Sequence, residues 1–289
     1  MSQINSSPLV SIIIPTFNRS ESLPRAIDSV LKQTFQDFEL IVVDDGSTDK
    51  TCQLPDSFND PRIKYEFQPN RGVSSARNRG IRISNGTFLS FLDSDDEWMP
   101  SKLEKQLAAL EDNPDHMIVH TDEMWVRNGR QINQKYKHRK YGGWIFRHCL
   151  PLCVISPSSI LLHRKVFSEI GLFNETFPVC EDYELWLRLS SRYPVLFIER
   201  PLLKKYGGHS GQLSKKYWGM DRFRVKALSE RIYSGDLTPR QEMLASGESA
   251  HKCRILEQGF SKRGKAAEAA YYRSKFREFG SINSGFKIY

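Results

Sequence analysis

The 289-residue chain lacks any apolar run near the roughly eighteen residues that a membrane-spanning helix needs. Its first residues, MSQINSSP, also lack the basic stretch and apolar segment of a secretory signal. Internal repeats and low-complexity segments are missing as well. These absences predict a cytoplasmic protein that lies outside the bilayer. With 39% hydrophobic residues, the chain can bury a full core as one large domain or as one domain with an appendage.

Cysteine is scarce and irregularly placed. The five cysteines, Cys52, Cys149, Cys153, Cys180 and Cys253, are odd in number and include no CxxC pair, which favours a reducing compartment. Cys149 and Cys153 have the i, i+4 spacing of two neighbours on one helix, but a zinc site needs further ligands. We therefore expect these thiols to pack in the core.

Basic residues outnumber acidic residues in two parts of the chain. Residues 221–289 hold 14 lysines and arginines against 8 acidic residues, and residues 127–148 hold seven basic residues and no acid. Such stretches are most often solvated surface, although together they can draw a protein to anionic lipid headgroups or to a phosphorylated acceptor. No nucleic-acid motif accompanies the charge, and the aromatic residues do not alternate with basic ones as base stacking requires. We expect no nucleic-acid partner.

The segment FLSFLDSDDEWMP, residues 88–100, carries the most informative pattern. Its apolar run ends in Asp93, Asp95 and Asp96, which places three carboxylates at the exit of a buried strand. Crowded carboxylates repel one another and lose hydration, and a divalent cation that holds a phosphate is the usual compensation. The alternative is an acidic turn that caps a helix entered at Pro100, since acids favour helix N-termini. These residues alone leave both interpretations open.

The first half of the chain alternates predicted strands with predicted helices. Residues 10–14 form a continuous β-branched run, typical of a strand buried on both faces. The helix opened by Ser20 has apolar residues at i, i+4, i+7 and i+8. Further strands are predicted at 38–43, 63–67, 87–92 and 117–120, and further helices at 74–83 and from Pro100. This order indicates an α/β fold with a mainly parallel central sheet flanked by helices, whose ligands bind at the carboxyl ends of the strands.

Beyond Thr121 the pattern changes. Asn128-Gly129, between short runs at 124–126 and 131–134, predicts a hairpin and hence antiparallel additions to the sheet. The next predicted elements are a strand at 158–163, a helix at 164–170 closed by Gly171, a helix at 181–191 and a strand at 194–198. From about Tyr217 no strand is evident, and residues 266–279 favour a helix. We expect a domain at 1–216, divided near 121, and a basic, mainly helical extension at 217–289.

Five strings of residues, in order and at compatible spacings, support a family resemblance. They are VSIIIPTFNR, ELIVVDDGSTD, NRGVSSARNRGI, FLSFLDSDD and EDYELWLRL, and they span residues 10–191. Together they resemble the family 2 glycosyltransferases, which have the GT-A type nucleotide-binding fold. The resemblance implies that residues 1–121 bind a nucleotide-sugar and residues 122–216 the acceptor. The match weakens past Ser191, and the extension has no counterpart in it.

The resemblance also assigns residues to the donor and to a metal. Implied contacts of the nucleoside and diphosphate are Pro15, Thr16, Phe17, Asp44, Asp45 (to uracil), Arg77, Asp93 and Ser94. Asp93, Ser94 and Asp95 match the DxD motif, in which one carboxylate meets the ribose and the other holds Mn²⁺ or Mg²⁺; Asp96 is a further ligand or a ribose partner. His209, in the glycine-rich GGHSGQLS, is either a metal ligand on a lid or a surface histidine.

The expected chemistry follows from the bond that is broken. Cleaving a sugar–phosphate bond leaves several negative charges on the nucleoside diphosphate, which a divalent ion stabilises as a Lewis acid. The acceptor hydroxyl attacks from the opposite face and needs a carboxylate to remove its proton. Asp182, beside Glu181 at a helix start, matches the catalytic base, and a direct displacement of this kind inverts the anomeric centre. We expect a UDP-sugar donor and a glycan or lipid-linked acceptor, met at the cytoplasmic face of a membrane.

Simpler interpretations of the same residues remain. Asp44-Asp45-Gly46 is also a plain turn pattern, and Glu181-Asp182 also suits the dipole of a helix N-terminus. A nucleotidyltransferase acting on a sugar phosphate can use the same sheet and paired aspartates, but its Gly-rich loop is missing, because that segment reads PTFNRSES. A non-catalytic nucleotide-sugar-binding protein is the third class, against which the set Asp45, Asp93, Asp95 and Asp182 argues.

Overall fold

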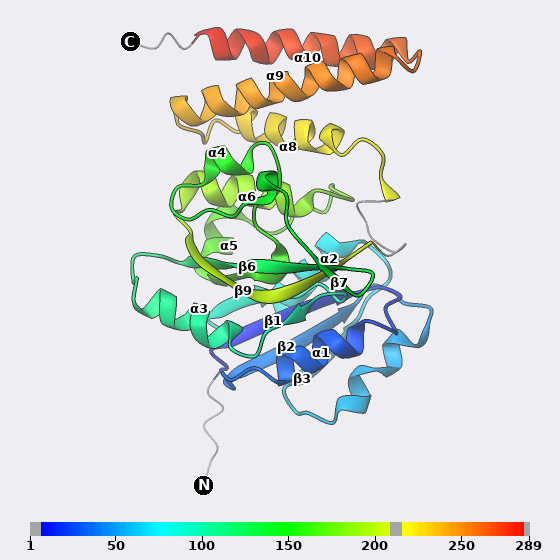
Figure 1. The fold of residues 1–289 in the computed structure, drawn as a ribbon, viewed down its shortest axis with the longest axis vertical. Helices are drawn as coiled ribbons and strands as arrows, with labels where there is room; N and C mark the ends of the chain where they lie inside the picture. The colour runs from blue at the N-terminus through cyan, green and yellow to red at the C-terminus, as the bar shows by residue number, and fades with distance from the viewer. Residues whose placement is uncertain (1–6, 209–215, 286–289) are drawn as a thin grey trace.

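The computed structural model describes residues 7–208 and 216–285. Within these ranges the strands form one sheet with helices on both faces, and three long helices are stacked beyond one face (Figure 1). The strand order across the sheet is β3-β2-β1-β4-β8-β6-β9-β5, and β7 pairs with β6. The expected α/β architecture with antiparallel additions is therefore confirmed.

The first half of the chain builds the parallel part of the sheet. β1 (Val10–Thr16) lies between β2 (Phe38–Asp44) and β4 (Phe88–Phe91), and β3 (Ile63–Phe67) pairs with β2. α1 (Leu23–Leu31) connects β1 to β2, and α2 (Val73–Ile83) connects β3 to β4. Each element was predicted, although α1 begins at Leu23 rather than at Ser20. Because these strands are parallel, their carboxyl ends meet at one edge of the sheet.

The second half adds antiparallel strands. β8 (Ile160–His163) pairs antiparallel with β4 and with β6 (Ile118–Arg127). β6 forms the predicted hairpin with β7 (Arg130–Ile132) around Asn128 and Gly129, both at positive φ. β9 (Leu196–Gly207) runs parallel to β6, and β5 (Glu97–Trp98) pairs antiparallel with β9 at the sheet edge.

Two strands are longer than predicted. β6 joins the strand expected at 117–120 to the first arm of the hairpin, and β9 continues from the expected 194–198 to Gly207. The two stay paired through register shifts between Thr121 and Met124, where Asp122 faces Pro201. Such irregularities interrupt the alternation of side chains, which is why the sequence pattern broke both strands too early. The two-residue β5 carries no pattern and was missed.

Successive residues of β1 pack into two different cores. Ile12 and Ile14 face α1 and α3 (Lys102–Glu111), whereas Ile13 faces α2, α5 (Lys165–Ile170) and α6 (Glu181–Arg192). α2 lies so close to the sheet that a Cβ on Gly80 would meet Ile13 Cγ2 at 2.5 Å. A residue other than glycine at position 80 therefore has to push α2 away from the sheet.

The C-terminal extension consists of three stacked helices. α8 (Asp221–Tyr233) lies on α6, and α9 (Pro239–Ser261) and α10 (Ala266–Gly285) follow as an antiparallel pair (Figure 1). α9 begins with a capping box in which Thr238 and Gln241 exchange hydrogen bonds. Leu228, Phe260 and Phe279 belong to the same buried cluster as α6. We propose that the described part of the extension, residues 217–285, extends the core of the 122–216 half rather than forming a separate body.

Short elements complete the described chain. They are α4 (Phe146–Cys149) and the 3₁₀ helices η1 (Lys50–Gln53), η2 (Pro55–Phe58), η3 (Tyr136–His138) and η4 (Pro157–Ser159). Because α4 ends at Cys149, Cys153 does not share its helix face. Cys149 is buried in the core and Cys153 packs against it, so the expected core packing of these two thiols is confirmed. All five cysteines are free thiols. Among the helices of residues 7–208 and 216–285, none combines the length and apolarity needed to span a bilayer.

Candidate active site

A cavity of about 1030 Å³ opens at the carboxyl ends of β1, β2 and β4. Its walls also include the start of α2, the first turn of α6, the end of β9 and residues just before α8. This is the edge of the sheet at which the fold predicts a ligand. Of the predicted site residues, Pro15, Thr16, Phe17, Asp45, Arg77, Asp93, Ser94, Asp95, Asp96, Glu181 and Asp182 line the cavity, Asp44 does not, and His209 lies outside the described residues.

Asp45 organises the loop that leads into α2. Its Oδ1 accepts hydrogen bonds from the Gln68 side chain (2.7 Å) and from the Arg71 N–H (2.9 Å), and its Oδ2 accepts one from the Gly72 N–H (2.8 Å). Asp45 is buried, yet it remains part of the cavity wall. A hydrogen bond from uracil to Asp45, as the resemblance implies, therefore has to be shared with this loop and stays a proposal.

Asp44 has a different role from the expected one. Its side chain is fully buried and accepts hydrogen bonds from the Ser47 N–H (2.7 Å) and the Tyr65 hydroxyl (3.0 Å). Gly46, at φ 84°, brings this turn so near to the next loop that a Cβ would lie 2.7 Å from the Asn70 nitrogen. The Asp44 carboxylate stabilises the turn and is not part of the cavity lining, so these contacts favour a structural role, and its expected contact with the nucleotide stays a prediction.

The end of β1 and the start of α2 present polar atoms without partners. Pro15 and Thr16 are buried, and Phe17 is 43% exposed on the cavity wall. Within the described ranges, Thr16 Oγ1, Ser74 Oγ and Arg77 Nε are buried and lack a hydrogen-bond partner. Such an unsatisfied group costs about 1–3 kcal/mol, so its place on a cavity wall points to a polar ligand.

The turn after β4 carries Asp93, Ser94 and Asp95. Asp93 is partly exposed, Ser94 is buried and Asp95 is half-buried, and all three line the cavity. Arg25 donates a hydrogen bond to the Asp95 carbonyl oxygen (2.7 Å) and fixes the turn from the α1 side. The geometry therefore keeps the DxD segment on the cavity wall.

Asp96 points into the protein. Its Oδ2 accepts a hydrogen bond from the Ser158 hydroxyl (2.7 Å) and its Oδ1 one from the Tyr206 N–H (3.1 Å). Burial, offset in part by Lys205 and reinforced by Asp95 and Asp93, raises the pKa of Asp96 well above its ordinary value. A carboxyl group with a raised pKa and two hydrogen-bond donors favours a structural role over the metal-ligand role expected from the sequence.

Arg77 connects the DxD turn to α6. Its guanidinium is 3% exposed and pairs with Asp93 Oδ1 and with Glu181 Oε1, each at 2.7 Å. Burial lowers the pKa of Arg77, but Asp93 and Glu181 outweigh burial and hold the pKa above its ordinary value. Both terminal nitrogens of Arg77 thus pair with carboxylates. These contacts favour a role for Arg77 as a bridge between Asp93 and Glu181 over the expected contact of its side chain with the nucleotide base or the diphosphate. The sequence gives no sign of this bridge, because its partners lie 16 and 104 residues away.

Glu181 and Asp182 occupy the first turn of α6 after a strained residue. Cys180 precedes them at φ 63°, a left-handed conformation that costs a residue other than glycine about 1 kcal/mol or more. Glu181 is buried against Arg77, and burial together with Asp182 raises the pKa of Glu181 against the opposing effect of Arg77. Asp182 is half-buried, with Oδ1 accepting from the Tyr183 N–H (2.7 Å) and Oδ2 from the Cys153 thiol (3.2 Å).

Two contributors near Asp182 were missed or left open. Cys153 lies on the cavity wall, and burial, then Asp182, raises the pKa of its thiol well above the ordinary value. Lys205, which the sequence left undecided between phosphate and solvent, lines the cavity, while Lys204 pairs with Glu97 at 2.8 Å. Burial lowers the pKa of Lys205, but carboxylates led by Glu123, Asp96, Asp93 and Asp182 hold it above its ordinary value. Only the long β9 could have revealed that Lys205 faces inward.

The carboxylates of the cavity fit a hard divalent ion only in part. Within residues 7–208 and 216–285, no three His, Cys, Asp or Glu side chains converge as a metal cluster. Asp95 and the neighbouring Asp93 still offer the oxygen ligands that Mg²⁺ takes, usually one or two carboxylates together with phosphate oxygens and water. The donor set thus fits a site completed by a diphosphate better than a protein-only cage.

Comparisons with known proteins agree with this geometry. The model of glycosyl transferase family 2 matches residues 11–171. An uncharacterized glycosyltransferase of Rickettsia felis is 38% identical over 72% of this chain, which spans only 36% of that protein. The Escherichia coli protein WfgD, a UDP-Glc:alpha-D-GlcNAc-diphosphoundecaprenol beta-1,3-glucosyltransferase, is 34% identical over 63% of this chain and 69% of its own.

A solved structure confirms the fold. The crystal structure of S. aureus TarS 1-349 in complex with UDP-GlcNAc superposes with a TM-score of 0.62 at 20% sequence identity. The superposition covers 93% of this chain and 91% of the TarS chain. The expected GT-A type fold is therefore confirmed, including the additional helices that the coverage takes in.

Proposed function

This chain belongs to glycosyl transferase family 2, and from that premise we propose that it moves a sugar, expected to be a hexose, from a UDP-sugar to a hydroxyl group of a glycan or lipid-linked acceptor with inversion of the anomeric centre. The observation that carries the proposal is that the DxD turn and the first turn of α6 line one cavity. WfgD, 34% identical, is named for UDP-Glc and for a diphosphoundecaprenol acceptor, which supports both choices. We place the reaction in polysaccharide biosynthesis on the cytoplasmic side of a membrane.

In the proposed mechanism, residues on different walls of the cavity have different roles. The divalent ion, when bound, neutralises charge on the departing diphosphate. Asp95, with Asp93 beside it, would hold that ion, while Thr16 and Ser74 offer unpaired hydroxyls to the donor. Asp182 Oδ2 accepts the proton of the acceptor hydroxyl, because Oδ1 is held by the Tyr183 N–H, whereas Oδ2 accepts from the Cys153 thiol, a weak donor that the hydroxyl can displace. Arg77 pairs with Glu181 and with Asp93 and fixes both carboxylates on either side of it.

The proposed function is tested most directly without an acceptor. A panel of nucleotide-sugars is incubated with the protein and Mn²⁺ or Mg²⁺, and released products are separated by chromatography. A glycosyltransferase slowly hydrolyses its donor and releases free nucleoside diphosphate. A nucleotidyltransferase instead yields pyrophosphate when given a nucleoside triphosphate and a sugar phosphate, and a binding protein yields no product. Release of UDP from one UDP-sugar supports the proposal, and no release from any nucleotide-sugar overturns it.

We expect UDP to bind tightly only with Mn²⁺ or Mg²⁺, and Asp95→Asn to weaken metal-supported binding by at least about tenfold. The reason is that the variant removes one charged oxygen ligand beside the diphosphate. Calorimetry with metal and with a chelator measures both effects. Asp112→Asn, an exposed aspartate at the end of α3, is the control and should bind UDP normally. Equal UDP affinity with metal and with chelator refutes the metal assignment.

We also propose peripheral contact with an anionic membrane through the two basic stretches. In residues 127–148 most basic side chains are exposed, although Lys140 is buried and pairs with Glu123 at 3.3 Å. Sedimentation with anionic vesicles should fall as salt shortens the Debye length to about 8 Å and below, and neutral vesicles should not bind. Binding that is absent at low salt, or unchanged by salt, rejects this contact.

A further inference from the structure

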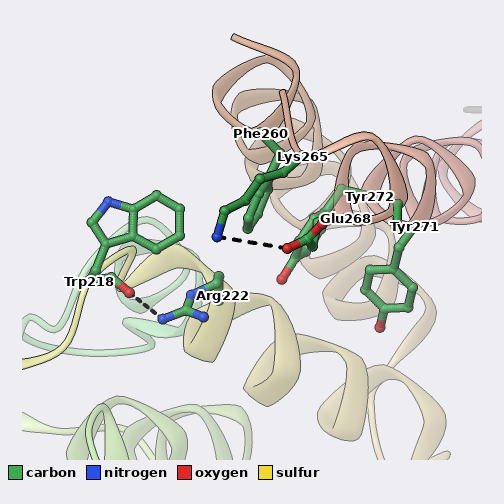
Figure 2. Close-up of a pocket in the computed structure, with 8 residues that line it drawn as sticks. Trp218, Arg222, Phe260, Lys265, Glu268, Tyr271 and Tyr272 are labelled. Atoms are coloured by element: carbon green, nitrogen blue, oxygen red, sulfur yellow. Dashed lines mark hydrogen bonds and ion pairs between the residues drawn. The ribbon is translucent and has the colours of Figure 1, made fainter. Parts of the chain in front are cut away.

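A second cavity lies within the C-terminal extension. It has a volume of about 420 Å³, within the usual range of ligand sites, and its walls come from the segment before α8, from α8 itself and from the junction of α9 and α10. Figure 2 shows the side chains that matter here: Trp218, Arg222, Phe260, Lys265, Glu268 and Tyr271. We call this the extension pocket.

Aromatic rings form the sides and back of the extension pocket. Trp218 is 48% exposed and Tyr271 is 55% exposed, and they stand on opposite sides of Lys265 and Glu268 in Figure 2. Behind them, Phe260 and Tyr272 are buried and stacked, with centroids 5.4 Å apart and planes 10° from parallel. A rigid apolar back wall with half-exposed rings at its sides suits the C–H faces of a sugar ring.

The charges of the extension pocket are mainly positive. Arg222 and Lys265 line the pocket, and their cationic groups lie 5.0 and 6.0 Å from the Trp218 ring centroid. Arg263 is not part of the lining, but its guanidinium lies 4.4 Å from the same centroid. Glu268 is the acid of the lining, and its Oε1 is 3.9 Å from Lys265 Nζ, with both side chains about half exposed. An exposed ion pair at this distance is weak, so an incoming anion can take Lys265 from Glu268. The excess of cations therefore selects a negatively charged ligand.

The extension pocket shares a wall with the cavity at the carboxyl ends of β1, β2 and β4, which we call the catalytic cavity. Lys216, Tyr217, Met220 and Arg224 line the catalytic cavity, whereas Trp218 and Arg222 line the extension pocket. Arg222 also donates hydrogen bonds to the carbonyl oxygens of Trp218 and Gly219, which fixes the segment between the two spaces. The segment at 216–224 thus contributes side chains to both spaces.

We propose that the extension pocket binds an anionic sugar unit of the acceptor, one that carries a carboxylate or a phosphate, away from the hydroxyl group that is glycosylated. The proposal rests on the proposed function, because it needs a saccharide acceptor. Lys265 and the guanidinium of Arg222 are charged donors that can bind either anion, and the aromatic rings contact the sugar. A lipid headgroup fits less well, since the pocket is concave and carries Glu268, whereas binding to an anionic bilayer favours projecting basic residues without acids.

The test compares two lysines of one turn. Lys265 lines the extension pocket, while Lys262 is equally basic, exposed and outside it. Calorimetry on the full chain uses a glucuronate-containing disaccharide, N-acetylglucosamine 1-phosphate and a neutral disaccharide as probes. We expect at least one acidic probe to bind, Lys265→Glu to weaken it about tenfold or more, and Lys262→Glu to leave it within about twofold. Tyr271→Ala, on an exposed side chain, should weaken it as well. The two acidic probes distinguish carboxylate from phosphate as the recognised group.

The remaining outcomes contradict the proposal. They are failure of both acidic probes to bind, equal loss in Lys262→Glu and Lys265→Glu, and equal binding of the neutral disaccharide. The proposal is also contradicted if the protein sediments with phosphatidylglycerol vesicles, Lys265→Glu abolishes this binding and Lys262→Glu preserves it. That result would identify the pocket as a lipid-binding site. Donor hydrolysis is measured on each variant and should stay at the wild-type rate. Absence of hydrolysis in the wild-type protein defeats the proposed function, and it leaves the saccharide titrations to decide the pocket by themselves.

Discussion

Replacing Asp182 by asparagine is expected to lower sugar transfer by about 10²- to 10⁴-fold while donor and metal binding stay unchanged. Asparagine has the same shape, so its oxygen can still accept the Tyr183 N–H as Asp182 Oδ1 does, and the first turn of α6 should keep its position. What disappears is the basic Oδ2 beside Cys153 that is proposed to take the acceptor proton. Initial rates of transfer and donor calorimetry on the same preparation measure the two effects.

The control for Asp182 addresses the helix-dipole interpretation of the same residue. Glu104 is also an acid in the first turn of a helix, α3, and its side chain accepts a hydrogen bond from Thr34 on the protein surface. Glu104→Gln should leave transfer within about twofold. Glu181→Gln should reduce transfer less than Asp182→Asn, because Glu181 is buried against Arg77 and does not meet the acceptor in the proposed mechanism.

Product stereochemistry gives an independent check on the base. A carboxylate that acts on the face opposite the leaving group predicts a β-linked product from an α-linked donor. Near-normal turnover of Asp182→Asn, or a product that keeps the donor's anomeric configuration, refutes the assignment of Asp182.

Loss of Arg77 is expected to produce the largest change in stability. Arg77→Met leaves Glu181 and Asp93 without their shared cation, and removing one partner of a buried ion pair costs about 3–5 kcal/mol. For a chain of this size that corresponds to a fall in Tm of roughly 10 °C. Arg79→Met is the matched control on the same helix, since Arg79 is 47% exposed in its pair with Glu66 and should cost at most about 1 kcal/mol. Thermal and urea unfolding of both variants measure the difference.

The stability defect of Arg77→Met should also depend on pH. Burial and Asp182 raise the pKa of Glu181, and Arg77 opposes that rise in the wild-type protein. A carboxyl group whose pKa is higher in the folded than in the unfolded state binds more protons when folded, so its penalty lies above that pKa and is relieved as pH falls. The gap in the free energy of unfolding between variant and wild type should therefore narrow as pH falls from neutral into the range in which Glu181 takes up a proton. Equal stability of Arg77→Met and Arg79→Met at neutral pH rules out the bridge as a stabilising contact.

The sequence predicted the elements whose local pattern and tertiary environment agree. β1, β2 and β3, the hairpin at Asn128-Gly129 and the helix ended by Gly171 all combine a strong local signal with the role they play in the fold. β9 was cut short because its later residues, such as Lys204 and Lys205, are charged, and only pairing with β6 and β5 makes them part of a strand. α9 was missed because its apolar residues are placed to contact the neighbouring helices and do not form one regular stripe along the helix.

The sequence predicted which residues form the candidate site but not the contacts between their side chains. Motif order placed Thr16, Asp45, Asp95 and Asp182 on one cavity. The Arg77 bridge, the inward orientation of Asp96 and the thiol on Asp182 depend on side chains that are distant in sequence. The residue pattern along one strand or helix cannot predict these contacts. It describes the order of residues within that element and not which strand ends lie together in the fold.

The segment at 216–224 contributes side chains to the walls of both proposed binding sites, so it can couple their binding equilibria. Since its residues line the catalytic cavity and the extension pocket alternately, any displacement on binding in one space changes the shape of the other. Thermodynamic linkage then requires reciprocity: the factor by which a bound saccharide changes donor affinity equals the factor by which donor changes saccharide affinity. If the acceptor stays in the extension pocket between transfers, it would alter the affinity for the donor before every transfer. The affinity for the next UDP-sugar would then depend on the growing polymer and not on the concentration of free donor alone.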